Sequence, residues 1–220
     1  MAKIALNPDA DQITPTAPAA SAALANPVNL PSQFEGEFTS ADTAIPYLAI
    51  CQKSGKMMDD NPGWLGNLIY NKELDLGKSV KAVFFRVRKY LLEDIPYGSD
   101  VIPRKFDTSA EAREAAVDVV DVAELDCLIE VPAAYDGGVA IGASHFAPAR
   151  YVVRSTAYRA TVPVLRKDLG LRLNNDLTNG FYTLSVEKKT YGANSWFAPN
   201  LSASGAPPDE VRAFIAEKFL

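Results

Sequence analysis

The sequence predicts an α+β fold that is mostly β, built as one barrel-like domain behind an N-terminal arm. Three observations support this prediction. Short segments with period-two alternation outnumber segments with helical spacing, turn-forming residues separate them, and no strand–helix–strand rhythm is present. With 220 residues, of which 48% are hydrophobic and 22% charged, the chain can fill one sizeable core.

The N-terminal segment is rich in Ala, Pro, Ser, Thr and Asn. Such a composition buries too little apolar surface to offset the entropy that is lost on ordering. We therefore predict a disordered arm at residues 1–40 and a folded domain at residues 41–220.

The clearest strand is predicted at Ser79–Leu92, where two sets of residues alternate: Val83, Phe85 and Val87, against Phe84, Arg86 and Arg88. One face of this strand would be apolar, and the other would carry an aromatic ring and two guanidinium groups. Other strands are predicted at Ile45–Ile50, Leu68–Tyr70, Leu125–Val131, Tyr151–Arg154, Phe181–Gly192 and Ser195–Leu201.

Two helices are predicted from their terminal residues. Thr108–Val117 begins with a cap residue followed by glutamates. A second helix opens at Pro207–Asp209 near the C-terminus and carries Val211, Phe214, Ile215 and Phe219 on one side. The segment Ser155–Leu169 has helical spacing, but Pro163 in its middle would break or kink a helix, so its state stays open.

Residues 107–136 hold nine acidic residues and one basic residue, Arg113. We interpret this segment as an acidic helical insertion, because the acids at positions 111, 114, 118 and 121 fit one solvated helical face. The alternative is a carboxylate cluster that holds divalent metal ions, as in a two-metal nuclease.

The sequence offers few residues for catalysis. His145 is the one histidine, Cys51 and Cys127 form no CxxC pair, and neither a Walker A loop nor a GxGxxG motif is present. We therefore expect a protein that is not an enzyme, with no cofactor and no metal site. No run approaches the roughly 18 apolar residues of a membrane helix, and a secretory signal is not recognisable, so we expect no membrane partner and a cytoplasmic location.

Two basic segments stand out against the net charge of -5. Residues 81–105 hold six bases and three acids, and residues 150–189 hold eight bases and three acids. Aromatic residues are interleaved with these bases: Phe84, Tyr90 and Tyr97 in the first segment, and Tyr151, Tyr158, Tyr182, Tyr191, Trp196 and Phe197 in or beside the second. Cations that neutralise phosphates and rings that stack on bases are what binding to single-stranded nucleic acid requires. The alternative is that most of the rings belong to the core and that the arginines are ordinary surface charges.

Four stretches in this order resemble phage-encoded single-stranded-DNA-binding proteins of the OB-fold type: Ile45–Gly55, Val80–Tyr90, Phe181–Leu201 and Gly205–Phe219. The resemblance implies an OB-like five-stranded barrel with a few short helices, in which one sheet face and the loops hold a single strand. The positions that it transfers are Phe84, Arg86, Arg88, Tyr90, Tyr182, Lys188 and Trp196, to which we add Arg154 from the second basic segment. The chain departs from proteins of this type by ending in AEKFL, which is not an acidic partner-recruiting tail.

We therefore predict a non-catalytic protein that coats single-stranded DNA in phage replication or recombination, in the host cytoplasm. Replication or recombination proteins, and further copies of the chain in a homo-oligomer, are the expected protein partners. The alternative is a phage structural or host-interaction protein that acts through protein–protein contacts.

Overall fold

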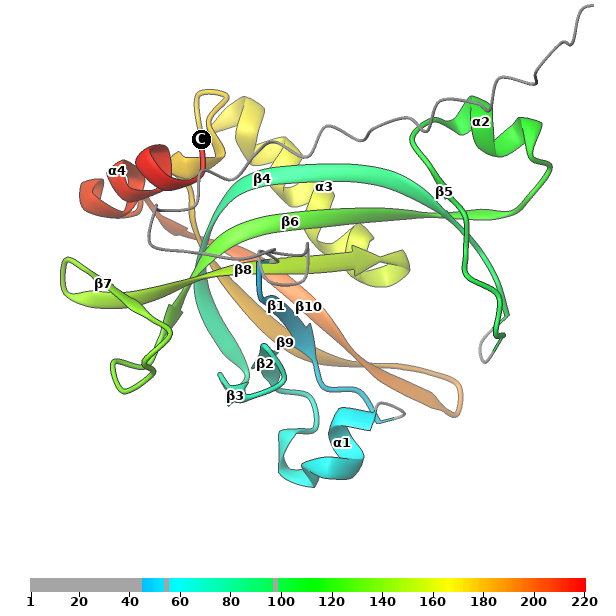
Figure 1. Ribbon diagram of the computed structural model, residues 1–220, viewed down its shortest axis with the longest axis horizontal. Coiled ribbons are helices and arrows are strands. Elements are labelled where there is room, and N and C mark those ends of the chain that lie inside the picture. The colour runs from blue at the N-terminus through cyan, green and yellow to red at the C-terminus, as the bar shows by residue number, and fades with distance from the viewer. Residues whose placement is uncertain (1–44, 54–55, 97–98) are drawn as a thin grey trace, which may run out of the picture. The chain divides into compact units, whose positions relative to one another are not determined.

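The computed structural model describes residues 45–53, 56–96 and 99–220, which belong to one compact unit, Thr43–Leu220 (Figure 1). The arm predicted at residues 1–40 lies outside the described residues. None of the helices in the described ranges is long and apolar enough to cross a membrane.

One mixed β-sheet dominates the unit, and ten strands contribute to it in the described part of the chain. Their order is β10-β9-β4-β6-β8-β1-β2-β3, while β5 pairs with β4 and β7 pairs with β8. The β1–β8 pair is parallel and the other registered pairs are antiparallel. The strands are β1 Tyr47–Ile50, β2 Leu68–Tyr70, β3 Leu74–Asp75, β4 Ser79–Glu93, β5 Lys105–Phe106, β6 Val119–Val131, β7 Val139–Ile141, β8 Ser144–Arg154, β9 Phe181–Tyr191 and β10 Asn194–Gly205.

The helices of the described residues are α1 Lys56–Asp60, α2 Ser109–Glu114, α3 Ser155–Leu171 and α4 Asp209–Lys218, with 3-10 turns at Pro62–Trp64 and Leu177–Asn179. The predicted cap of α2 is confirmed, because the Thr108 side chain accepts a hydrogen bond from the Glu111 backbone N–H. The segment Ser155–Leu169, which contains Pro163, is helical and lies within α3. Pro163 lies on the exposed side of α3, where water can satisfy the carbonyl group that loses its N–H partner.

The prediction of an OB-like five-stranded barrel is wrong, because the sheet is larger and forms a curled half-barrel (Figure 1). Strands β4 and β6 span 15 and 13 residues and pair over Ala82–Glu93 and Val119–Ile129. The first half of β8 was not predicted, because His145 and Pro148 interrupt its alternation. The strands β5 and β7 were not predicted because they are only two and three residues long.

The acidic helical insertion predicted at residues 107–136 is wrong beyond α2. Most of this segment forms β6, which lies between β4 and β8 near the centre of the sheet. Glu124 and Asp126 are two residues apart, which is the spacing of one strand face rather than of one helix face. Glu111 and Glu114 lie exposed on α2 as predicted, whereas Glu124 and Asp126 belong to a sheet surface.

A β-bulge in β4 decides which side chains share a face. Phe84 lies opposite Cys127, and Arg86 lies opposite Asp126, the preceding residue of β6, so Phe85 is an extra residue in the ladder. The bulge breaks the alternation that the sequence predicts. Phe84 and Arg86 consequently point to opposite faces of the sheet.

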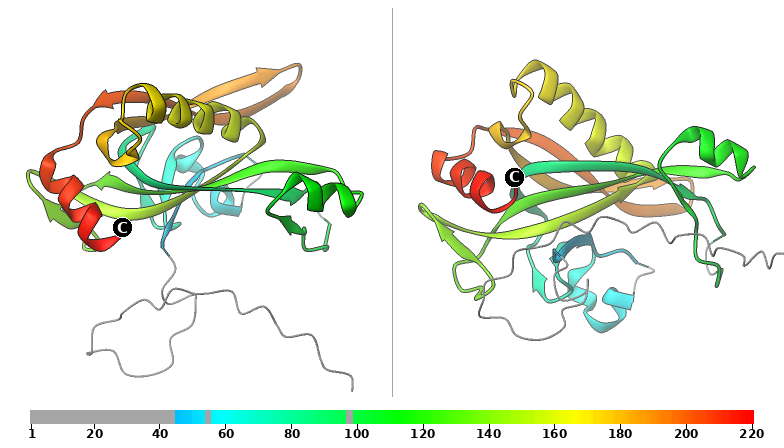
Figure 2. Two further views of the ribbon diagram at one scale, coloured as in Figure 1. Left: turned by 90° about the horizontal axis from the view of Figure 1, so that it is seen from above. Right: turned by 45° about the horizontal axis from the view of Figure 1, so that its top comes forward.

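Each face of the sheet has its own core, and Figure 2 shows α3 and α4 on opposite sides of the long strands. The inner core lies under α3 and includes Ala82, Phe84, Leu125, Cys127, Ala149, Tyr151, Leu165, Tyr182, Leu184 and Leu201. The outer core lies under α4 and includes Val83, Phe85, Leu128, Phe146, Val211 and Ile215. The predicted apolar side of the C-terminal helix is thereby confirmed. Helix α4 covers only one end of the outer face, and the rest of that face is not covered by α4.

Side chains after β1 join the two sides of the curled sheet, Lys53 by a 3.1 Å hydrogen bond to Ser195 Oγ and Gln52 by two hydrogen bonds to the backbone of β10. The Gln52 side-chain N–H donates to the Phe197 carbonyl at 2.7 Å, and the Phe197 N–H donates to Gln52 Oε1 at 3.0 Å. The Gln52 side-chain amide therefore exchanges two hydrogen bonds with the Phe197 backbone, as a backbone amide group does in a β-sheet, and links the end of β1 to β10. Next to it the Phe197 ring packs on Gly66, where an added Cβ would come within 2.5 Å of the ring.

We expect Gly66→Ala to lower the free energy of unfolding by about 2–4 kcal/mol. Gly66 has φ of +72°, and a methyl group would also collide with the Phe197 ring. Gly77 has a similar φ of +75° and open space around it, so Gly77→Ala isolates the backbone contribution. Denaturant unfolding of the two variants checks this expectation, and equal losses would show that the contact with Phe197 is unimportant.

Candidate nucleic-acid interface

The outer face carries three rows of side chains across β4, β6 and β8 beside α4, and Arg86 of the first row donates a hydrogen bond to the carbonyl group of Phe219 at the end of α4, at 3.0 Å. Residues that stand opposite one another in the strand registers form each row. The rows, which we call the outer lattice, are Arg86–Asp126–Arg150, Arg88–Glu124–Val152 and Tyr90–Val122–Arg154. The alternation of the three strands thus brings four arginines and one tyrosine to one surface.

Two carboxylates hold part of the outer lattice together. Arg150 donates two hydrogen bonds to the buried carboxylate of Asp126, at 2.7 and 3.2 Å, and Arg86 lies 3.9 Å from the same group. Glu124 pairs with Arg88 at 3.3 Å and with Arg150 at 3.8 Å. Four guanidinium groups against two carboxylates leave two positive charges in excess.

The four arginines differ in how far they are engaged. Arg150 is fixed by Asp126, and this hydrogen bond raises the pKa of its guanidinium group further above the usual value. The side chains of Arg86 and Arg88 are about half exposed, at 47% and 53%. Arg154 is exposed and forms no ion pair within the described ranges. Arg88 and Arg154 are therefore the cations most available to a ligand.

Aromatic rings lie at the margins of the outer lattice, each beside a lysine. The Lys105 ammonium group is 3.8 Å from the centre of the Tyr90 ring, and Lys72 is 5.6 Å from that of Tyr47. Burial, and secondarily the charge of Glu124, raises the pKa of Tyr90, which keeps its hydroxyl group neutral. Tyr47 stands opposite Arg150 in the β1–β8 register. The surface thus combines cations with flat rings.

Four of the eight residues predicted to bind nucleic acid meet in the outer lattice: Arg86, Arg88, Tyr90 and Arg154. Two others are core residues, so their assignment to the site is wrong. Phe84 and Tyr182 are both 0% exposed, and their rings pack edge to face with centres 5.7 Å apart. The Tyr182 hydroxyl group donates to Asp168, and burial is the main cause that raises its pKa to about 12.

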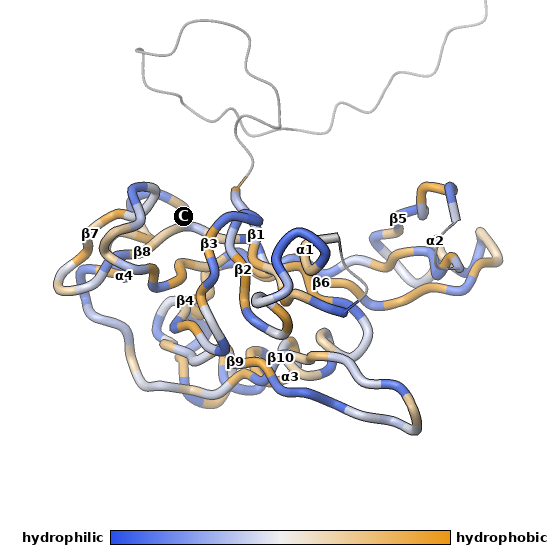
Figure 3. The backbone as a smooth tube through the Cα atoms, turned by 90° about the horizontal axis from the view of Figure 1, so that it is seen from below, coloured by the Kyte–Doolittle hydropathy of each residue, from blue (hydrophilic) through white to orange (hydrophobic). Residues whose placement is uncertain are grey.

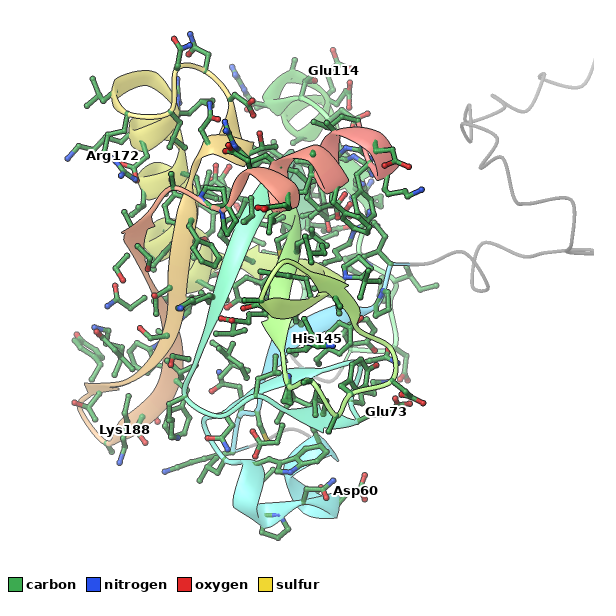
Figure 4. The ribbon with its side chains drawn as sticks, turned by 90° about the vertical axis from the view of Figure 1, so that its left-hand side faces the viewer. Asp60, Glu73, Glu114, His145, Arg172 and Lys188 are labelled. Carbon is green, nitrogen blue, oxygen red and sulfur yellow. The ribbon has the colours of Figure 1, made fainter. Side chains whose placement is uncertain are left out.

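The last two predicted residues, Lys188 and Trp196, lie in the β9–β10 hairpin rather than in the outer lattice. Lys188 stands opposite Phe197 and Trp196 stands opposite Lys189, so Lys188 and Trp196 occupy opposite faces of this ribbon. Figure 4 shows Lys188 far along the hairpin, well away from Arg172 at the end of α3. The Trp196 indole N–H is enclosed and finds no hydrogen-bond partner in the described part of the chain. Lys188 and Trp196 therefore do not join the other predicted residues on the outer lattice.

Arg150, Glu124 and Asp126 were not predicted as members of this surface. The signal is period-two spacing, with Arg150 and Arg154 four residues apart on β8 and the two acids two residues apart on β6. It does not show in the sequence because residues 107–136 predict a helical insertion, and the strand predicted at Leu125–Val131 includes Asp126 but not Glu124. Among the described residues, no three His, Cys, Asp or Glu side chains are placed to hold a metal ion.

We expect Asp126→Asn to lower the free energy of unfolding by about 1–3 kcal/mol. The substitution removes the buried charge that fixes Arg150 and leaves the guanidinium group without its main partner. Asp121→Asn is the control, because Asp121 of the same strand β6 forms an exposed ion pair with Lys89 of β4. Thermal unfolding of both variants gives the comparison, and equal losses would contradict a special role for the buried carboxylate.

Comparisons with known proteins identify no relative. No family model matches the chain, and neither a curated protein nor a solved structure is significantly similar to it.

Proposed function

We propose that the protein binds single-stranded nucleic acid without catalysis and that the outer lattice is its contact surface. The observation that carries this proposal is the excess of arginine over carboxylate on a sheet face that α4 leaves open. Arg88 on β4 and Arg154 on β8 supply exposed positive charge at the two sides of this face. Neutralised phosphates would provide most of the affinity, through the release of condensed counterions.

The arrangement of rings and cations supports a single strand rather than a duplex. Tyr90 and Tyr47 offer ring surfaces at opposite margins of the outer lattice, and bases can stack on rings only when they are not paired. The sheet face of the outer lattice carries no projecting helix of the kind that reads the major groove of a duplex, and the β9–β10 ribbon lies outside this face. We therefore propose little sequence preference.

In the cell, this activity corresponds to coating and protecting single-stranded DNA during phage replication or recombination. We place it in the cytoplasm of the host cell, which agrees with the two buried free thiols, Cys51 and Cys127. Replication or recombination proteins and a second copy of the chain are the protein partners that we propose.

A second candidate function, a protein–protein contact in a phage assembly or on a host protein, is favoured by the β9–β10 hairpin. Beyond its pairing with β4 the hairpin projects as a two-stranded ribbon whose side chains are mostly hydrophilic (Figure 3). Tyr191 near its tip is 81% exposed. A protruding ribbon with an exposed ring suits insertion into a partner.

Fluorescence anisotropy separates the two candidates. The full chain is titrated against a labelled single strand of about 30 nucleotides, a size that exceeds the span of one binding module, at low and physiological salt. Duplex of equal length is the control for strandedness. A Lys188→Gln/Lys189→Gln variant tests the hairpin as the alternative contact.

We expect tight binding to the single strand. The affinity should fall as salt rises and should be the same in the hairpin variant. Absence of binding at low salt would overturn the proposal, and equal affinity for duplex would overturn its single-strand character. Loss of binding in the hairpin variant would move the site from the outer lattice to the hairpin.

A further inference from the structure

A groove of about 690 Å³ opens where β1 leaves β8, next to the outer lattice. The two strands are registered over two pairs only, Tyr47 with Arg150 and Leu48 with Tyr151. Beyond these pairs β8 continues to its end, whereas β1 turns toward β10, where Gln52 meets Phe197. The divergence of the two strands leaves the groove between them, within the volume range of about 300–1,000 Å³ that is usual for small-molecule sites.

The lining of the groove is mainly apolar, with cations at one side. Ala49, Val152, Ala157 and Phe197 contribute apolar surface, and Arg150 and Arg154 contribute guanidinium groups. Both arginines also belong to the outer lattice. A ligand in the groove would therefore be flat or apolar in one part and anionic in the part that faces the lattice.

Backbone groups of β8 give the groove polar atoms as well. The Arg150 N–H donates to the Pro46 carbonyl across the β1–β8 boundary at 2.8 Å. Because alternate residues of a strand direct their backbone groups to the same side, Val152 directs its N–H and C=O toward the groove, past the last registered pair. One donor and one acceptor thus stand side by side at an apolar slot.

We infer that this groove receives one unpaired nucleobase of the strand that the outer lattice holds. An apolar slot accepts the faces of a base, and the donor and acceptor of Val152 suit the polar edge of a base. Arg150 and Arg154 would then contact the phosphates on either side of that nucleotide. The inference rests on the proposed function and deepens it, because a base can enter the groove only when it is free of a complementary strand.

The test compares two single strands that have equal numbers of phosphates, oligothymidylate and a fully abasic strand of the same length. Two variants fill the groove from different elements, Ala49→Leu from β1 and Ala157→Leu from α3. Neither alanine belongs to the outer lattice. Circular dichroism and thermal unfolding establish whether each variant is folded. If one variant does not fold, the other still tests the groove.

The wild-type chain should bind oligothymidylate about tenfold or more tightly than the abasic strand, from one buried base. Each filled variant should bind the abasic strand like the wild type and lose the part of this preference that comes from the groove, while it keeps the part that comes from stacking on Tyr47 and Tyr90. Equal affinity of the wild type for both strands would overturn both the base pocket and the stacking on these two rings, and would leave only the phosphate contacts of the outer lattice. Failure to bind either strand would overturn the proposed function itself. If both folded variants keep the full preference for oligothymidylate over the abasic strand, the base does not bind in the groove. A protein segment would then be the remaining candidate for its occupant.

Discussion

Phe84→Ala should lower the free energy of unfolding by about 3–5 kcal/mol, the cost of removing a fully buried aromatic ring. Phe84 is 0% exposed in the inner core and packs against Tyr182. Its loss would leave a cavity in contact with both β6 and β9, which the close-packed core cannot fill without strain. Denaturant unfolding monitored by circular dichroism measures the change.

Tyr191→Ala is the control for Phe84→Ala. Tyr191 is an aromatic residue of the same chain that is 81% exposed, so its replacement should change the stability by less than about 0.5 kcal/mol. If Phe84 stacked on bases instead, Phe84→Ala would weaken nucleic-acid binding and leave the free energy of unfolding nearly unchanged. A small stability change at Phe84 would therefore contradict its place in the inner core.

Arg88→Gln/Arg154→Gln should weaken single-strand binding by about 10- to 100-fold at low salt, from the loss of two charge-assisted phosphate contacts. These residues carry the least engaged guanidinium groups of the outer lattice, and Glu124 keeps Arg150 as a partner after the change. The plot of log affinity against log salt should become shallower by about 1.4, at 0.7 for each phosphate of a single strand.

The matched control for this double variant is Arg159→Gln/Arg166→Gln. Both residues are exposed arginines on α3, which lies on the opposite side of the sheet, and the change in net charge is the same. The control should keep the affinity and the salt slope nearly unchanged. Equal weakening in the two double variants would mean that only the net charge of the protein matters.

Local elements were predictable from the sequence because short-range physics determines them. The Thr108 cap, the apolar stripe with Val211 and Ile215, and the β9 and β10 strands follow from capping, periodicity and turn residues. The curled sheet was not predictable in the same way. Its strand order joins β4 to β9 and β1 to β8, pairs that lie far apart in the chain and leave no local signal.

Only part of the candidate site could be predicted from the sequence, because residues of one strand are placed by their spacing, whereas residues of different strands are placed by strand pairing. Arg86, Arg88 and Tyr90 share a strand, and their spacing alone puts them on one face. Phe84 was wrongly joined to them because a one-residue bulge reverses the face of a strand, and nothing in the alternation of Val83 to Arg88 shows where the bulge lies. Arg150 could be placed beside the others only once the β6–β8 register was known.

Photocrosslinking shows whether a single strand lies across β4, β6 and β8. The full chain is irradiated with an oligonucleotide that contains 5-iodouracil, and mass spectrometry locates the linked residues. A strand held by the outer lattice should crosslink at Tyr90 and Tyr47, at its two margins. Crosslinks confined to Tyr191 and Trp196 of the β9–β10 hairpin would contradict this placement.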